Sequence, residues 1–197
     1  VDKSHVRMFY MRSVEEAFRA VSRSDFLLNE LKGRASNDTP LSIGHGQTNS
    51  QPFTVNAMLD WLEVEEGQIV LDVGSGSGWT SALLAYLTGE TGHVYAVEAI
   101  PELVAFGQKN CERLGIENIS FHHASKIIGL PEKAPFDRIL VSASASRFPD
   151  ELVDQLAAPG RMVVPIGETI YEVYKDEEGD LSLEDHPGFT FVPLVGV

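Results

Sequence analysis

The chain has 197 residues, of which 43% are hydrophobic, and a formal net charge of −14 at pH 7. This length and composition predict one domain with one well-buried core. The negative charge disfavours nucleic acid as a partner, because nucleic-acid binding relies on Lys and Arg side chains that displace counterions from phosphates. No apolar run is long enough to cross a bilayer and no signal peptide opens the chain, so we expect a soluble, cytoplasmic protein.

Cysteine and histidine are too sparse to suggest a redox or metal site. Cys111 is the only cysteine, which excludes an internal disulfide and fits a reducing compartment. Cys and His do not cluster with the spacing typical of metal ligands, and His122-His123 is an isolated pair, so we expect no metal. For the oligomeric state we favour a monomer.

Helical patterns precede the first expected strand. Apolar residues recur at helical spacing from residue 14 to residue 30, and residues 33–40 have the composition of a loop. Pro52 opens a second stretch with apolar residues three and four positions apart, and Glu66-Gly67 ends it. We therefore expect residues 1–51 to form a helical leader and a loop in front of the main fold.

Apolar segments then alternate with helical segments along the chain. Near-continuous apolar strands of this kind predict a parallel sheet that is covered by helices on both faces and binds ligands at the carboxyl ends of its strands. We expect this α/β core to span residues 52–167. The expected strands are residues 68–73, 93–98, 119–123, 137–143 and 161–166, and the expected helices are residues 80–87, 101–114 and 149–158.

Two further strands are expected in the C-terminal part, residues 168–197. They span residues 170–175 and 189–197, and the acidic segment 174–180 between them is interpreted as the solvated tip of a hairpin. Paired antiparallel, they complete a mostly parallel sheet of seven strands. The whole chain, residues 1–197, is expected to form one domain.

The most informative stretch is residues 70–79, VLDVGSGSGW, where an apolar strand meets three alternating glycines and then a helical segment. Glycines let the backbone approach a ligand closely, and free N–H groups at the start of the helix attract polar ligand atoms. A dinucleotide site needs Gly or Ala where Trp79 or Ser81 stands, and a P-loop needs a Gly-Lys-Ser/Thr that does not follow here. S-adenosylmethionine remains as the ligand, although a bare strand-to-helix turn would carry the same glycines.

Two acidic residues strengthen this interpretation. Asp72 ends the strand before the turn, where its charge suits the cationic sulfonium and amino group of S-adenosylmethionine. Glu98 ends the next strand, where a carboxylate can accept hydrogen bonds from both ribose hydroxyls. Each acid alone also fits a solvated strand end or a helix start. Both together, around one glycine turn, predict an adenosine-containing ligand.

Three segments resemble the protein-L-isoaspartate (D-aspartate) O-methyltransferase family, whose members are class I S-adenosylmethionine-dependent methyltransferases. They are the polar loop of residues 43–52, IGHGQTNSQP, the glycine turn, and residues 191–196, FVPLVG. The Gly-Gln-Thr-x-Ser-Gln-Pro loop is specific to this family, whereas many methyltransferases share the glycine turn. Further similarity lies in residues 19–26, 134–137 and 156–167, so the resemblance covers nearly the whole chain.

The resemblance implies a Rossmann-like α/β fold and a repair enzyme. Such an enzyme transfers the methyl group of S-adenosylmethionine to the free α-carboxylate of L-isoaspartyl residues in damaged proteins or peptides. Two alternatives stay open. The chain could be a methyltransferase of the same fold that acts on another peptide or small-molecule carboxylate, or a non-catalytic relative that binds the cofactor.

The resemblance also implies roles for particular residues. Ser50 matches the active-site serine, although a serine just before Gln51-Pro52 would also be well placed to cap the helix that follows. Ile43 and Thr48 belong to the same substrate loop, and the segment Val192-Pro193-Leu194 would wall the substrate cleft. The implied cofactor-binding residues are Asp72, Gly74, Gly76, Gly78, Glu98 and Ser125.

Two residues depart from the family pattern. Asn49 stands where the family usually has an apolar residue, so a buried Asn there would need partners or would reshape the loop. Ser125 stands where the family usually has an acid that accepts a hydrogen bond from the adenine amino group, and a serine hydroxyl can still accept one. The serine-rich run 142–146 is a further difference in a loop expected near both ligands. These differences bear on which acceptor is methylated and on how the adenine is bound, more than on the fold.

Overall fold

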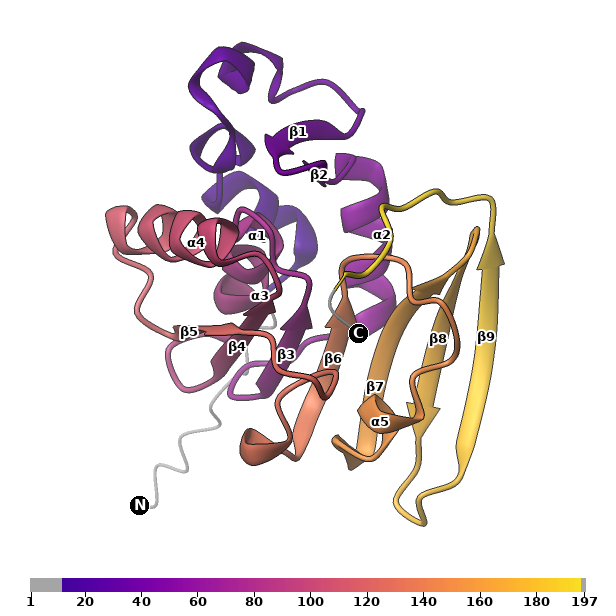
Figure 1. Cartoon of the computed structure of the whole chain (residues 1–197). Coiled ribbons are helices and arrows are strands. Elements are labelled where there is room, and N and C mark those ends of the chain that lie inside the picture. Colours follow the sequence, from indigo (N-terminus) through magenta and orange to yellow (C-terminus); the bar gives the residue numbers. More distant parts are fainter. Residues whose placement is uncertain (1–11, 196–197) are drawn as a thin grey trace, which may run out of the picture.

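A central sheet of seven strands organises the computed structural model, which describes residues 12–195 (Figure 1). The strands are hydrogen-bonded in the order β5-β4-β3-β6-β7-β8-β9, parallel from β5 to β7 and antiparallel at β8 and β9. The predicted mostly parallel seven-stranded sheet is therefore confirmed. The strands are β3 (Ile69–Val73), β4 (His93–Glu98), β5 (Ile119–His123), β6 (Phe136–Val141), β7 (Leu156–Ile166), β8 (Thr169–Lys175) and β9 (Leu181–Pro187).

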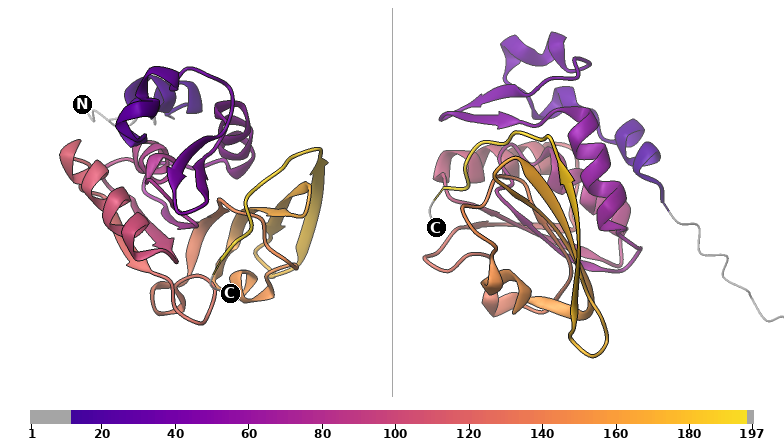
Figure 2. Two further views of the ribbon diagram at one scale, coloured as in Figure 1. Left: turned by 45° about the horizontal axis from the view of Figure 1, so that its top comes forward. Right: turned by 90° about the vertical axis from the view of Figure 1, so that its right-hand side faces the viewer.

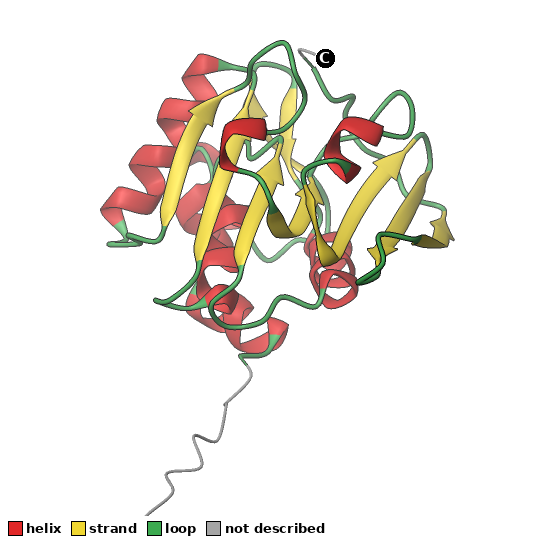
Figure 3. Ribbon diagram, turned by 90° about the horizontal axis from the view of Figure 1, so that it is seen from below, coloured by secondary structure: helices red, strands yellow, loops and turns green. Residues whose placement is uncertain are grey.

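Helices cover the two faces of the sheet unequally. Helices α1 to α4 pack on one face, and the other face is covered by the short helices α5 and η3 and the loop before η3 (Figure 3). Among residues 12–195, no helix combines the length and the apolarity that crossing a bilayer requires. The helices are α1 (Val14–Ala20), α2 (Pro52–Leu62), α3 (Trp79–Thr88), α4 (Pro101–Arg113) and α5 (Asp150–Val153), with 3-10 helices η1 (Arg23–Phe26), η2 (Asn29–Arg34) and η3 (Pro131–Lys133).

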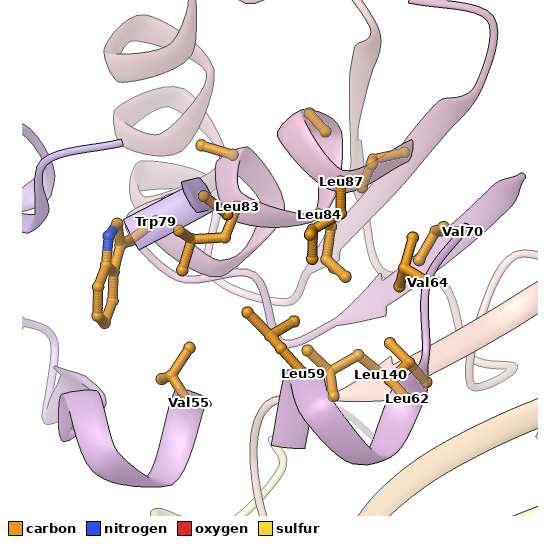
Figure 4. Packing of buried hydrophobic residues seen from close by; sticks show 14 of the residues in the cluster. Val55, Leu59, Leu62, Val64, Val70, Trp79, Leu83, Leu84, Leu87 and Leu140 are labelled. Atoms are coloured by element: carbon orange, nitrogen blue, oxygen red, sulfur yellow. The ribbon is translucent and has the colours of Figure 1, made fainter. Parts of the chain in front are cut away.

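Two clusters of buried side chains hold these layers together. Leu59 of α2 and Leu84 of α3 point toward one another on the face where Val70 of β3 also packs (Figure 4). Leu71, the next residue of β3, belongs to the cluster on the other face, with Ile128. Successive strand residues thus face opposite apolar layers, which is why β3 reads as a continuous apolar run. The expected organisation as one domain stays a prediction.

The last strand of the sheet was predicted in the wrong place. The structure pairs β9, Leu181–Pro187, antiparallel with β8, whereas residues 189–195 form an irregular segment and residues 196–197 lie outside the described part. The predicted acidic hairpin tip does form the turn that joins β8 and β9. Because β9 is an edge strand with mostly exposed side chains, it needs no apolar face. Its polar sequence therefore lacks the apolar pattern from which strands were predicted.

Two helical predictions were also too long. Only Asp150–Val153 of residues 149–158 is helical, because β7 already begins at Leu156, which pairs with the buried Phe136 of β6. In residues 14–30, helix α1 ends at Ala20 and the 3-10 helix η1 follows. The remaining helices begin and end within a few residues of their predicted positions.

A separate two-stranded hairpin lies above the carboxyl ends of the central strands (Figure 2). It consists of β1 (Leu41–Gly44) and β2 (Gln47–Asn49), joined by a turn in which His45 has a φ of 55°. The sequence predicted a loop here, and the flanking glycines explain how the chain reverses so tightly. This hairpin carries the residues that the resemblance assigns to the substrate.

Candidate active site

The glycine turn follows β3 directly and adopts a conformation that requires glycine. Gly74, Gly76 and Gly78 have φ angles of 85°, 53° and 84°, in the left-handed region that side chains disfavour. A Cβ on Gly78 would lie 3.1 Å from Cα of Gly107 in α4, so this glycine also permits the close approach of α3 and α4. Gly74 and Gly76 line a pocket, whereas Gly78 supports the packing beneath it.

Glu98 lies beside this turn because β4 is the parallel neighbour of β3. Its Oε2 accepts a hydrogen bond from Gly76 N at 2.9 Å, and its Oε1 accepts from Ala99 N at 2.8 Å and Ile100 N at 3.0 Å. A carboxylate offers about four lone-pair sites, so one on Oε2 remains for a ligand. Glu98 therefore keeps an acceptor site for a ligand, and its contact with both ribose hydroxyls stays a prediction.

Asp72 is completely buried and does not line the pocket. Its two oxygens accept hydrogen bonds from Ser81 Oγ at 2.6 Å and Ser142 Oγ at 2.8 Å. Together its surroundings raise the pKa of Asp72 to about 6: burial raises it most, the hydrogen bonds from the two hydroxyl groups lower it, and the charge of Glu98 adds a smaller increase. Ser142 does line the pocket, so its hydroxyl joins Asp72 to the pocket wall.

The first pocket extends from the glycine turn between the hairpin and two loops. Its floor is the turn with Glu98, and its roof is Ile43 and Thr48 of the hairpin. Ile43 is buried, with only 3% of its surface exposed, because it lies against the turn. The other lining residues include Ala124, Ile127, Ile128, Gly129, Ser142, Val192, Pro193 and Leu194.

A second pocket adjoins the first and contains Ser50. The two pockets share Thr48, Ser142 and Val192 as lining residues, so groups bound in each would meet at this common wall. Ser50 is half-buried, and its hydroxyl has no hydrogen-bond partner among residues 12–195. The structure thus brings Ser50 and the predicted substrate residues to one place. The other lining residues are Pro40, Gln51, Thr54, Thr190 and Phe191.

Ser50 does not cap helix α2. The N-cap residue is Gln51, and its side chain makes no capping hydrogen bond. Asp38 supplies the cap instead, because its carboxylate accepts hydrogen bonds from Phe53 N at 2.8 Å and Gln51 Nε2 at 3.0 Å. The alternative role that the sequence suggested for Ser50 is therefore wrong, and its hydroxyl remains available for a ligand.

The C-terminal segment is fixed against the serine-rich loop after β6. Ser144 N donates to Val192 O at 2.9 Å, and Leu194 N donates back to Ser144 O at 2.8 Å. Pro193 forms an isolated bridge with Ser144 between these two bonds. The segment predicted as a strand thus serves as a wall of both pockets.

Ser125 is the one assigned cofactor residue that the structure places at the surface. It is exposed, and its hydroxyl donates to Ile127 O at 3.1 Å and accepts from Ile127 N at 3.2 Å within a local turn. Its neighbours Ala124 and Ile127 line the first pocket, but Ser125 does not. A contact between Ser125 and adenine stays a prediction.

Three buried polar residues at the site were given no role by the sequence analysis. Gln155 anchors the loop that forms one pocket wall, and Arg23 holds the segment around Ser50. The hydroxyl oxygen of Ser75, in the glycine turn, is buried without a hydrogen-bond partner in the described residues. Only the glycine pattern pointed to Ser75; neither Arg23 nor Gln155 belongs to a pattern from which its role could be predicted.

These features fit an adenosine-containing ligand. The Ser75 hydroxyl is buried in the turn without a partner among the described residues, which is rare for a polar atom, although Ser75 itself does not line the pocket. The cradle formed by Gly74 and Gly76 leaves room for a polar group of the ligand, and Glu98 offers a free lone pair next to it. Aliphatic side chains of Ile127 and Ile128 provide an apolar wall suited to a planar base.

One group of potential metal ligands lies on β8 and β9 and contributes no residue to either pocket. The ligand atoms of Glu172, Glu184 and His186 lie within 4.8 Å of one another. Glu172 is already paired with Arg161 at 3.4 Å and with His186 at 2.7 Å. These contacts account for the cluster, and the absence of a metal site stays a prediction.

Comparisons with known sequences point to one family. Residues 2–197 match the family described as Protein-L-isoaspartate(D-aspartate) O-methyltransferase (PCMT). The chain is 43% identical to the protein-L-isoaspartate O-methyltransferase of Methanothrix thermoacetophila over 194 residues, which cover 97% of this chain and 91% of that protein. It is 41% identical to the protein of the same name from Pyrococcus abyssi over 188 residues, which cover 93% and 86% of the two chains.

Solved structures agree with these sequences. A protein-L-isoaspartate O-methyltransferase superposes with a TM-score of 0.83 at 28% identity, covering 91% of this chain but 60% of that chain, so this chain spans less than two thirds of that protein. A Plasmodium falciparum structure described under the same enzyme name superposes with a TM-score of 0.80 at 29% identity, covering 93% of this chain and 90% of that chain. That second structure is a complex with S-adenosyl-L-homocysteine.

Proposed function

This chain belongs to the protein-L-isoaspartate (D-aspartate) O-methyltransferase family, and from this premise we propose that its two adjoining pockets hold the methyl donor and the acceptor carboxylate. It is an S-adenosylmethionine-dependent methyltransferase that acts on L-isoaspartyl residues in protein repair. One observation carries the assignment of the pockets: Ser50, whose hydroxyl has no hydrogen-bond partner within residues 12–195, lines a pocket that shares Thr48, Ser142 and Val192 with the glycine-turn pocket.

The first pocket is proposed to hold S-adenosylmethionine. Gly74 and Gly76 let the backbone approach it, and Glu98 accepts a hydrogen bond from a ribose hydroxyl. When bound, S-adenosylmethionine supplies a methyl group on a positively charged sulfur. The negative charge of Asp72 lies behind Ser142 and favours a cation at this end of the pocket.

The acceptor needs orientation more than activation. The free α-carboxylate of an isoaspartyl residue has a reference pKa of about 4 and is ionised at neutral pH, so no general base is required. Transfer of a methyl cation equivalent to a carboxylate neutralises both charges, which a pocket with little water favours. The side chains of Ile43, Val192 and Leu194 exclude water from the common wall.

Ser50 is proposed to position one carboxylate oxygen. Its hydroxyl can donate a hydrogen bond to that oxygen and leave the other oxygen in line with the methyl group. Thr48, on the common wall of the pockets, can assist from the neighbouring strand. Such alignment of reacting atoms accounts for several powers of ten in rate in comparable reactions.

A paired-peptide assay tests the acceptor. The protein is incubated with radiolabelled S-adenosylmethionine and two synthetic peptides that differ only in L-isoaspartate or L-aspartate at one position. We expect label on the isoaspartyl peptide alone. Label on both peptides, or on a small carboxylate in preference to either, would assign a different acceptor, and a protein that binds S-adenosylhomocysteine without any turnover would be a non-catalytic relative.

We further propose a cytoplasmic monomer without a nucleic-acid partner. The single cysteine, Cys111, is buried and cannot form an internal disulfide, in keeping with a reducing compartment. The net charge of −14 opposes binding to a phosphate backbone. Localisation of the tagged protein and light scattering in solution test the first two points.

A further inference from the structure

Asn49, which departs from the family pattern, is buried between the substrate loop and the glycine turn. Only 4% of its surface is exposed. Its Nδ2 donates a hydrogen bond to Ser77 Oγ at 3.1 Å, and its Oδ1 accepts one from Arg23 Nε at 2.7 Å. The partners that a buried Asn requires are therefore present, and they belong to two different parts of the site.

Arg23 extends this connection to Ser50. Its Nη2 donates to the backbone oxygens of Asn49 at 3.1 Å and Ser50 at 2.8 Å, and to Thr39 O at 2.9 Å. Burial lowers the pKa of Arg23 to about 10, against the charge of Asp38, so the guanidinium remains protonated at neutral pH. Arg23 thus fixes the backbone that carries the Ser50 hydroxyl.

Ser77 gives the other end of the connection a rigid support. It lies between Gly76 and Gly78 in the turn, and its carbonyl oxygen accepts a hydrogen bond from Asn110 Nδ2 at 3.0 Å. The hairpin contacts the turn a second time through Ile43, whose Cδ1 lies against Gly76. The turn and the segment that contains Ser50 are thus joined by a hydrogen bond and by an apolar contact.

We propose that Asn49 is a positioning residue that holds Ser50 in register with the cofactor turn through Ser77. This inference rests on the proposed roles of the two pockets and adds a link between them. Binding of the cofactor product in the first pocket then orders residues 49–51. None of residues 49–51 lines the first pocket, where this ligand binds; Ser50 and Gln51 line only the second pocket, and Asn49 lines neither. Direct contact with the ligand would therefore not explain the expected ordering of these residues.

Four variants test the link. Asn49→Ile removes both hydrogen bonds of the side chain and introduces an apolar residue of the family type. Ser77→Ala removes only the acceptor hydroxyl and is the gentler change, which keeps the test valid if the first variant folds poorly. The double variant completes the cycle, and Asn56→Ala is the matched control, because Asn56 is hydrogen-bonded to Asp60 on the outer side of α2.

Hydrogen–deuterium exchange with and without S-adenosylhomocysteine is the first measurement. In the wild type, the ligand is expected to slow exchange in residues 49–51 about tenfold, and this gain should largely vanish in Asn49→Ile and Ser77→Ala but persist in Asn56→Ala. The measurement needs no acceptor, so it remains informative even if the proposed acceptor is wrong. Equal protection in all variants, or none in the wild type, overturns the proposal.

Kinetics with the isoaspartyl peptide is the second measurement. We expect each single variant to lower kcat about tenfold while the Kd for S-adenosylhomocysteine changes less than about threefold, because only the placement of Ser50 is lost. The double variant should be no slower than the slower single variant, since both changes break one connection. Effects that multiply, or a loss confined to thermal stability, would show that Asn49 only supports the fold.

Discussion

The Cδ1 atom of Ile43 lies 3.0 Å from the point where a Cβ on Gly76 would lie. The hairpin therefore rests on the glycine turn at Gly76, whose backbone N–H also donates to Glu98. A side chain at this glycine would push the hairpin outward and fill the cradle. This contact makes the roof and the floor of the first pocket interdependent.

Gly76→Val is accordingly expected to abolish binding of S-adenosylhomocysteine. The branched side chain meets Ile43, and the φ of 53° adds strain of about 1–2 kcal/mol. Gly179→Val is the matched control, because Gly179 has a φ of 91° and open space around its Cβ position. Calorimetric titration should show loss of binding in the first variant alone. Normal affinity in Gly76→Val would refute the assignment of the pocket.

Ser50→Ala should lower turnover at least about tenfold and leave cofactor affinity unchanged. The melting temperature should also stay the same, because Asp38 and not Ser50 caps helix α2. Ser182→Ala, an exposed serine on β9, serves as the control. Steady-state rates and thermal melts separate the two roles. A lower melting temperature with an unchanged rate would show that Ser50 stabilises the fold and does not position the acceptor.

Asp72→Asn tests the buried carboxylate. Because the folded pKa of about 6 lies above the reference value of 3.8, the folded state holds the proton more tightly, and stability falls as the pH rises from about 4 through about 6. The shift corresponds to a cost on the order of 3 kcal/mol above pH 6. Asn can still bond to Ser81 and Ser142, since the hydroxyl groups can rotate.

The variant should therefore unfold at higher denaturant concentration than the wild type at pH 7 and gain little at pH 4. Its affinity for S-adenosylmethionine should fall, because the negative charge behind the cationic group is lost. Denaturant titrations of both proteins across this pH range give the comparison. A parallel pH dependence in the two proteins would mean that Asp72 has an ordinary pKa.

The sequence predicted those parts of the fold and site that have a periodic pattern of apolar residues or a short local motif. The glycine turn and Glu98, the acid that ends β4, lie side by side as predicted, because their spacing reflects backbone contacts made within one β-α-β unit. Strand β9 was missed because both its faces are largely exposed, and the apolar residues 191–194 were read as a strand although they wall a pocket. An apolar run in the sequence indicates that its side chains are buried. It does not distinguish side chains buried in a pocket wall from side chains buried in a sheet.

Arg23, Gln155 and the capping role of Asp38 could not have been predicted in the same way. Arg23 and Gln155 bind backbone groups of loops, and Asp38 binds the backbone at the start of α2, so each contact joins segments that only the tertiary structure brings together. For Asn49 the sequence raised the question of partners, but only the structure places Ser77 and Arg23 beside it. Single buried polar residues of this kind produce no periodic pattern in the sequence from which they could be recognised.

Gln155 anchors the loop opposite the glycine turn. Its Oε1 accepts from Leu130 N at 2.7 Å, and its Nε2 donates to Ile128 O at 2.8 Å, while the amide packs so closely under Gly129 that a Cβ there would lie 2.4 Å from Oε1. Ile128 and Gly129 line the first pocket. The side chain, only 4% exposed, therefore sets the position of this apolar wall.

Gln155→Leu keeps the volume of the side chain but removes these bonds, and it leaves a buried N–H and a buried carbonyl without partners. We expect a loss of about 1–3 kcal/mol in the free energy of unfolding, with weaker binding of S-adenosylhomocysteine at a temperature where the variant is folded. Gln108→Leu, on the exposed side of α4, is the control. Equal affinity in Gln155→Leu, despite lower stability, would show that the loop keeps its shape without this anchor and that the adenine wall is held by Ile127 and Ile128 packing alone.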